Sequence, residues 1–211
     1  IERELRAFGF DSSLAESVQT DLQAVGATPF TAEPDAPGLA DLPRASQLRE
    51  LEFTLSAKRP KLGELAEILE RHGAPAAAPA YPEQLRALST QSLQPFLRGF
   101  IDLMFEWEGR WYVADYKSNM LPSYGPDALV EAVQREHYLL QAQLYSAAAQ
   151  RFLRQQVPGY VPDAHWGGAL FFFLRGMRGA DRPGASVVCE RQSGERLEAV
   201  DAWLGRGGEA G

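Results

Sequence analysis

The segment at residues 99–119 restricts the fold of this chain more than any other stretch. It reads GFIDLMFEWEGRWYVADYKSN, two runs rich in aromatic and branched apolar residues on either side of a turn. Glu108 and Gly109 suit a two-residue hairpin turn, because glycine adopts the positive φ that such turns require. Trp107 then opposes Arg110. Counting outward along both strands gives the other opposed pairs: Met104 with Val113, Asp102 with Asp115, and Phe100 with Lys117.

Three charged side chains meet in this predicted hairpin, although most of their neighbours are apolar. Asp115 and Lys117 share one face because strand side chains alternate, and Asp102 lies directly across from Asp115. Opposed Cβ atoms lie about 4.5 to 5.5 Å apart, so two carboxylates there repel each other unless one takes a proton or a cation lies between them. Oxygen ligands with an open side favour a hard ion such as Mg²⁺. The sequence therefore predicts a metal site that activates a water molecule.

Other interpretations of these charges remain open. Asp115 and Lys117 also fit a structural ion pair, and either aspartate fits a solvent-exposed strand end. A glycosidase pair of carboxylates fits less well, since such pairs need a separation of about 5 to 9.5 Å and no neighbouring lysine. Glu52, which alternates with apolar residues on its own strand, fits either a contribution near the same site or an exposed position.

Hydrophobic periodicity divides the rest of the chain into short strands and helices. The predicted strands cover 49–57, 97–106, 111–118 and 167–175, and the predicted helices cover 12–25, 61–72, 127–155 and 194–204. Loops rich in proline at 28–43 and 73–82 separate them. Strand 167–175 is apolar almost throughout, which is typical of a strand buried on both faces. A long helix between strands indicates a mixed α/β sheet covered on both faces, in a single domain.

Composition limits the class of protein. The chain has 211 residues, 45% of them hydrophobic, which is enough for one domain with a substantial core. It lacks an apolar run of the roughly 20 residues that span a bilayer, so we expect no membrane segment. A single cysteine suits a reducing compartment, and we therefore expect a cytoplasmic location. The net charge of −7 argues against DNA binding through a broad basic surface.

Several segments together carry a resemblance to a known family. Asp102 followed by Asp115-Tyr116-Lys117 matches the signature of the PD-(D/E)XK nuclease superfamily, an acidic residue on one strand and acid-x-Lys on the next. The segments LRELEFTLS, HYLLQAQLYSAAAQRFLR and HWGGALFFFLRG extend the similarity over about residues 48–178. There the chain resembles the C-terminal nuclease domain of the RecB family of helicase-nuclease subunits. The resemblance implies a restriction-endonuclease-like α/β fold, a mixed β-sheet flanked by helices.

The resemblance also implies a reaction and a set of catalytic residues. It implies a Mg²⁺-dependent deoxyribonuclease of the exonuclease V type, acting as an exonuclease and single-strand endonuclease in recombinational repair of double-strand breaks. Mn²⁺ or Ca²⁺ could occupy the same site. By position, Asp102, Asp115 and the main-chain oxygen of Tyr116 would bind the metal. Lys117 would orient or help deprotonate the attacking water and stabilise charge on the phosphate.

A helical element supplies further candidates. The Gln-x-x-x-Tyr element of the family matches Gln141 and Tyr145, and Tyr138 shares their helix face by spacing alone. The resemblance implies that these residues contact the active site or the DNA strand being cut. Hydrogen bonding that only joins the helix to the sheet is the other interpretation of Gln141 and Tyr145.

The resemblance further implies that the chain is part of a larger subunit. Its parts would be a helical and linker region at 1–47, the nuclease core at 48–178 and an extension with a tail at 179–211. The implied partners are DNA and RecC-like and RecD-like subunits, and ATP would act only through helicase domains outside this chain. The family also has a histidine ligand on an upstream helix, for which no match occurs before residue 48. The alternative function is therefore a catalytically incomplete module that docks partner subunits or grips DNA.

Overall fold

The computed structural model describes residues 1–33, 35–56, 60–88 and 96–205. Its mixed sheet has the strand order β1-β2-β3-β4-β5. The strands are β1 (Gln47–Ser56), β2 (Phe96–Trp107), β3 (Arg110–Lys117), β4 (Trp166–Phe173) and β5 (Val187–Glu190). β3 and β4 run parallel, and each other neighbouring pair is antiparallel. The predicted α/β class is confirmed. Position 57 of the first predicted strand and residues 206–211 of the predicted tail lie outside the described residues.

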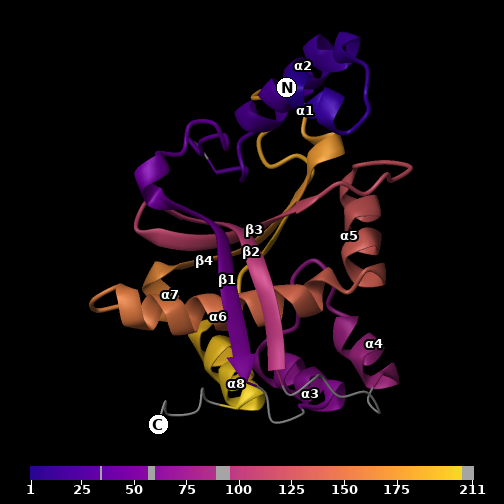
Figure 1. The fold of residues 1–211 in the computed structure, drawn as a ribbon. Helices are drawn as coiled ribbons and strands as arrows, with labels where there is room; N and C mark the ends of the chain where they lie inside the picture. The colour runs from indigo at the N-terminus through magenta and orange to yellow at the C-terminus, as the bar shows by residue number, and fades with distance from the viewer. Residues whose placement is uncertain (34, 57–59, 89–95, 206–211) are drawn as a thin grey trace.

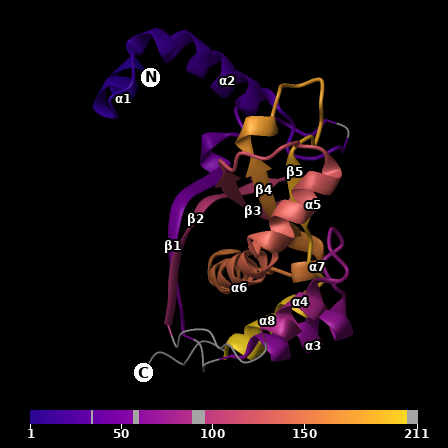
Figure 2. The same cartoon turned by 90° about the vertical axis from the view of Figure 1, so that its right-hand side faces the viewer.

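Helices pack on one side of the sheet and at both ends of the molecule (Figures 1 and 2). The helices are α1 (Glu2–Ala7), α2 (Ala15–Ala27), α3 (Leu62–His72), α4 (Tyr81–Ala87), α5 (Pro126–Arg135), α6 (Tyr138–Gln156), α7 (Pro162–His165) and α8 (Gly194–Leu204). α6 contacts β1, β3 and β4, while α3, α4 and α8 gather at one end and α1 and α2 lie at the other. In the described part of the chain, no helix combines the length and apolar character needed to cross a membrane.

The sheet has a hydrophobic core on each face. On the helical face, β2 and β3 contribute Met104 and Val113 to a core that also contains α3, α5, α6 and α8. On the other face, Leu103 and Ala114 pack beneath the segment that follows α2, whose Phe30 is 1% exposed. Every residue of β4 is buried, as its apolar sequence predicts.

The hairpin of β2 and β3 has the predicted turn, and its register is the predicted one as far as Leu103 and Ala114. Glu108 and Gly109 form the turn with φ of 48° and 74°, the pair of positive values that a type I′ turn requires. Met104 pairs with Val113. The recorded ladder begins at Trp107 with Arg110 and ends at Leu103 with Ala114.

Beyond that last pair the sheet forks. β2 continues beside β1 as far as Phe96, and β3 continues beside β4 as far as Lys117. Figure 1 shows β1 and β2 running together away from β3. Asp102 and Asp115 therefore lie at the mouth of the fork and are not paired in the ladder, so the prediction that they oppose each other directly is wrong. The same holds for Phe100 and Lys117. In β1, Glu50 has a φ of 51°, so the edge strand is also distorted at this level.

Two predicted elements were wrong in extent. The predicted helix 127–155 is two helices, α5 and α6, because His137 between them has a left-handed φ of 54°. No glycine or proline marks this break in the sequence. A distant contact accompanies the break, the 3.2 Å hydrogen bond between His137 Nδ1 and the Tyr81 hydroxyl. Helix α4 begins at Tyr81, inside the predicted loop 73–82, with Pro82 in its first turn.

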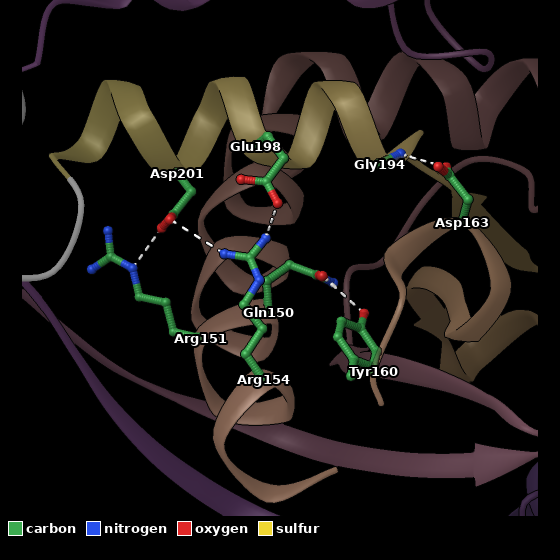
Figure 3. A network of polar contacts seen from close by, with 8 residues as sticks. All are labelled: Gln150, Arg151, Arg154, Tyr160, Asp163, Gly194, Glu198 and Asp201. Atoms are coloured by element: carbon green, nitrogen blue, oxygen red, sulfur yellow. Dashed lines mark hydrogen bonds and ion pairs between the residues drawn. The ribbon is translucent and has the colours of Figure 1, made fainter. Parts of the chain in front are cut away.

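Polar contacts fix the C-terminal half of α6 against α8 (Figure 3). Arg151 Nε donates to Asp201 Oδ1 at 2.6 Å and Arg154 pairs with Glu198. At the other end of α8, the Gly194 N–H donates to Asp163 Oδ1 at 2.7 Å. Because α6 also carries Gln141 and Tyr145, this attachment holds the helix that faces the fork.

A buried ion pair joins α8 to β5 and gives a stability prediction. Arg196, 3% exposed, donates to Glu190 Oε1 at 2.6 Å and to the carbonyl oxygens of Gly73 at 2.7 Å and Arg191 at 2.9 Å. Arg196→Met leaves the Glu190 carboxylate, 1% exposed, without its counter-charge. We expect it to lower the free energy of unfolding by about 3 kcal/mol in urea denaturation.

The double variant Glu190→Leu/Arg196→Met is the control, because it removes both charges together. It should recover most of the lost stability. A single variant as stable as the unmodified chain would show that the pair does not hold α8 in place.

Candidate active site

Asp115 and Lys117 form a nearly buried ion pair near the end of β3. They alternate with Tyr116, so both side chains lie on the face of the sheet that α6 covers. Lys117 Nζ lies 2.6 Å from Asp115 Oδ2, and the two residues are 9% and 7% exposed. Such a pair is costly to bury, so its remaining hydrogen-bonding groups need further partners.

Gln141 of α6 supplies those partners. Its Oε1 accepts a hydrogen bond from Lys117 Nζ at 2.7 Å, and its Nε2 donates to Asp115 Oδ1 at 2.8 Å. The same Nε2 donates to the Tyr145 hydroxyl at 2.7 Å, one helical turn further on. The Tyr145 ring packs edge-on against Phe53 of β1, with 5.5 Å between ring centroids. Gln141 therefore fixes both charged groups of β3 relative to the helix.

Tyr138 completes the surroundings of the lysine. Lys117 Nζ lies 3.6 Å from the centroid of the Tyr138 ring, a cation–π contact, and 5.5 Å from that of Phe171. The Tyr138 hydroxyl donates to Asn119 Oδ1 at 3.0 Å. Sequence analysis missed Asn119. Its position two residues after Lys117 gave no signal that the chain turns back toward α6.

Asp102 joins the group across the fork. Its Oδ2 accepts a hydrogen bond from the Tyr116 N–H at 2.9 Å, so the side chain takes the place of a β2 carbonyl where the ladder has ended. This contact fixes one carboxylate oxygen beside the peptide unit that follows Asp115. The six sequence-predicted residues therefore meet at one place: Asp102, Asp115, Lys117, Tyr138, Gln141 and Tyr145.

The pKa shifts at the site also indicate that the two aspartate carboxylates lie close enough to repel each other. Burial raises the pKa of Asp115 and the negative charge of Asp102 raises it further, while Lys117 and Gln141 oppose the shift. Burial raises the pKa of Tyr145 to about 12, and the charges of both aspartates add to that shift. A cation placed between the carboxylates would remove their repulsion.

Glu52 and the three histidines of the chain lie elsewhere. Glu52 is on the outer face of β1, where its Oε1 lies 2.5 Å from Arg98 Nε, so it is not part of the site. His72 lies 3.9 Å from Glu195, His137 contacts Tyr81, and His165 contacts the backbone of residue 161.

The donor set fits a hard divalent cation. The aspartates offer carboxylate oxygens and Tyr116 offers its main-chain oxygen, and Mg²⁺ is commonly bound by one or two carboxylates while it retains several waters. Within residues 1–33, 35–56, 60–88 and 96–205, no group of three or more His, Cys, Asp or Glu side chains is placed to hold a metal ion. Waters and a phosphate oxygen would therefore have to supply the remaining positions.

Gln141 gives a prediction that tests this arrangement. Gln141→Leu keeps the size of the side chain but removes its bonds to Asp115 and Lys117, so the two charges lose their fixed orientation. The family resemblance implies metal-dependent cleavage of DNA, and we expect that activity to fall 10- to 100-fold, the effect typical of residues that orient metal ligands. Tyr145→Phe is the control, because it keeps the ring and removes only the hydroxyl, and it should cost less. Equal losses in both variants would contradict the central role of Gln141.

Comparisons with known proteins agree with this geometry. The model of the PD-(D/E)XK nuclease superfamily matches residues 17–206. The chain is 33% identical over 205 residues to the RecBCD enzyme subunit RecB of Escherichia coli (strain K12), which covers 95% of this chain and 17% of that protein. It is 31% identical over 205 residues to RecB of Haemophilus influenzae, again 95% of this chain and 16% of that protein.

RecB of Mycobacterium tuberculosis (strain CDC 1551 / Oshkosh) is 34% identical over 190 residues, which cover 82% of this chain and 17% of that protein. The chain thus spans about a sixth of the length of the curated relatives it matches. The family match, the fork between β2 and β3, and the acid-x-Lys pattern at its mouth lead to one assignment. This chain belongs to the PD-(D/E)XK nuclease superfamily.

Proposed function

We propose that this chain is a Mg²⁺-dependent deoxyribonuclease domain that hydrolyses phosphodiester bonds in DNA. By its similarity to RecB, it would act as an exonuclease and single-strand endonuclease within a RecBCD-type helicase-nuclease, in recombinational repair of double-strand breaks. One observation carries the proposal. Asp115 and Lys117, held by Gln141, lie at the mouth of a fork whose other strand brings Asp102 to the same place.

Asp102, Asp115 and the main-chain oxygen of Tyr116 would hold the metal. A bound hard divalent cation supplies two effects, a lower pKa for a coordinated water and neutralisation of charge on the phosphate. The hydrogen bond from the Tyr116 N–H keeps Asp102 in place. Gln141 keeps Asp115 in place through its Oδ1. Fixed ligands of this kind reduce the reorganisation that the reaction requires.

Lys117 would act on the phosphate and the attacking water. Water, oriented by Lys117, attacks phosphorus and gives up a proton to solvent, the bond from phosphorus to the leaving oxygen breaks, and that oxygen takes up a proton from solvent. Negative charge grows on the phosphate oxygens as this happens. The Lys117 ammonium, held between Gln141 Oε1 and the Tyr138 ring, would stabilise that charge.

The proposed partners explain the acidic composition. The chain carries a net charge of −7, which argues against DNA binding through a broad basic surface. In a RecBCD-type complex, RecC-like and RecD-like subunits would deliver a strand to the site. ATP would act through helicase domains outside residues 1–211. A local positive charge at Lys117 and a bound metal are then sufficient at the cut phosphate.

Cleavage of labelled linear DNA tests the proposal. The chain, and a longer form extended upstream, would be incubated with single-stranded and double-stranded substrates in Mg²⁺, in Ca²⁺ and after chelation. We expect Mg²⁺-dependent cleavage that chelation abolishes. Cleavage that persists after chelation, or an absence of cleavage in both forms, would reject the proposed function.

A further inference from the structure

The two N-terminal helices present an apolar surface to solvent. α1 has six residues and α2 has 13, and neither helix buries a single side chain. Figures 1 and 2 show both helices at one end of the molecule, beyond the sheet. Large apolar side chains there are strongly exposed: Phe8 at 77%, Phe10 at 58%, Leu22 at 54%, Ile1 at 46% and Leu14 at 45%.

Helices of this length do not form stably in water by themselves. Isolated helices shorter than about 12 to 15 residues are marginal, and in proteins the burial of an apolar face supplies most of their stability. On α2, Val18, Leu22 and Val25 lie at i, i+4 and i+7, so they line one face. A soluble monomer rarely leaves such a continuous apolar face uncovered. Of these three residues Leu22 is 54% exposed, whereas Val18 and Val25 are half-buried and Val25 packs against the core of the outer sheet face, so the face is only partly covered within this chain.

This face lines two adjoining hollows, which we call the α1–α2 groove. The larger hollow, of about 500 Å³, lies between α2 and the segment after β4, and its apolar lining includes Leu39, Leu174 and Met177. The smaller, of about 300 Å³, is lined by Ile1, Glu4, Leu5, Phe8, Phe10, Val18 and Leu22. Val18 and Leu22 belong to both linings, so the two hollows adjoin along this face of α2.

The groove also reaches the strand that carries the candidate active site. Tyr116, between Asp115 and Lys117, lines the larger hollow with its ring stacked on Phe172 at 6.0 Å and 40% of the residue exposed. Arg175 lines it too, and its Nε donates to the Ser118 carbonyl at 2.9 Å. A segment bound in the groove would therefore contact β3 on the face of the sheet opposite to the Asp115 and Lys117 side chains.

We propose that the α1–α2 groove is the docking site for polypeptide that precedes residue 1 in a longer protein, an amphipathic segment that lays its apolar side along α2. Ile1 itself lines the smaller hollow, so any preceding residues would emerge beside the groove. The relatives carry about five-sixths of their length outside the matched region, which is ample chain to cover it.

The lining favours a protein segment over a DNA strand. Apolar side chains dominate both hollows, and one of the two arginines at the larger one, Arg178, pairs with Asp21 at 3.4 Å. The rim of the groove carries both positive and negative side chains. Such a rim suits the polar residues that border the apolar face of an amphipathic helix better than it suits a row of phosphates. The docked segment would bury Tyr116 and so stabilise the end of β3.

Cysteine labelling in the longer protein tests this docking. Cys189→Ser removes the native thiol, and Leu22→Cys places one on the proposed interface. Thr20→Cys is the matched control, because Thr20 is exposed on the same helix and lines neither hollow. We expect a maleimide to react at least about tenfold more slowly at position 22 than at position 20. Phe8→Cys places a thiol in the smaller hollow, and its rate of reaction with the maleimide should be slowed in the same way.

A photo-crosslinker attached to the same thiol identifies the occupant. Crosslinks from position 22 to residues that precede residue 1 of the same polypeptide would support the proposal. Crosslinks to a second copy, to another protein or to added single-stranded DNA would overturn it. Equal reactivity at positions 20 and 22 would overturn it as well, since the groove would then be open. Neither the labelling rates nor the crosslinks require nuclease activity, so the docking proposal can fail independently of the proposed function.

Discussion

Asp115→Asn is expected to lower Mg²⁺-dependent cleavage of DNA by about 10⁴-fold or more, equal to about 5.5 kcal/mol at the transition state. The asparagine oxygen can still accept the hydrogen bond from Gln141 that now reaches Asp115 Oδ1. Its amide nitrogen, however, faces Lys117 Nζ with a donor where the carboxylate offers an acceptor at 2.6 Å. The substitution also removes one of the two carboxylates proposed to hold the metal. Single-turnover cleavage of end-labelled linear single-stranded DNA gives the rate.

Glu52→Gln is the matched control for this experiment. It makes the same chemical change two strands away in the sheet, on a side chain that pairs with Arg98 on the outer face of β1. We expect its cleavage rate to equal that of the unmodified chain. Calcium binding measured by calorimetry should weaken in Asp115→Asn and stay unchanged in Glu52→Gln. Cleavage that survives the Asp115 substitution would refute the assignment of the site.

Lys117→Met is expected to lower cleavage by about 10³-fold while metal binding persists. The ammonium has no proposed role as a ligand, but it lies 2.6 Å from Asp115 Oδ2 and competes with a cation for that oxygen. Its removal should therefore leave calcium affinity equal or higher. Without metal, the variant leaves the buried Asp115 carboxylate unpaired, which raises its pKa further and destabilises the fold. Added Ca²⁺ should restore part of that stability.

Lys61→Met controls for the loss of a positive charge. Lys61 is exposed at the start of α3, and its removal changes the net charge by the same amount. We expect no effect on cleavage and none on metal affinity. If Lys117→Met instead lost metal binding and cleavage together, the lysine would be a structural element of the site and its proposed role in the reaction would be wrong.

The sequence alone determined the local geometry of the hairpin. A two-residue turn at Glu108 and Gly109 fixes the register of the strands it joins, and strand alternation puts Asp115 and Lys117 on one face without reference to any other part of the chain. The apolar run of β4 likewise predicts a strand buried on both faces. Gln141 and Tyr145 share a helix face by spacing. These features depend on residues close together in the chain.

Only the tertiary structure decided where those features end and what they meet. The fork between β2 and β3 arises because β2 follows β1 and β3 follows β4, pairings between segments far apart in sequence. At the break between α5 and α6, His137 contacts Tyr81, 56 positions away. The bridge from Gln141 to Asp115 and Lys117 depends on the path of α6 across the sheet. Short-range patterns carry no information on such contacts, because their stability comes from packing between elements that the local sequence cannot specify.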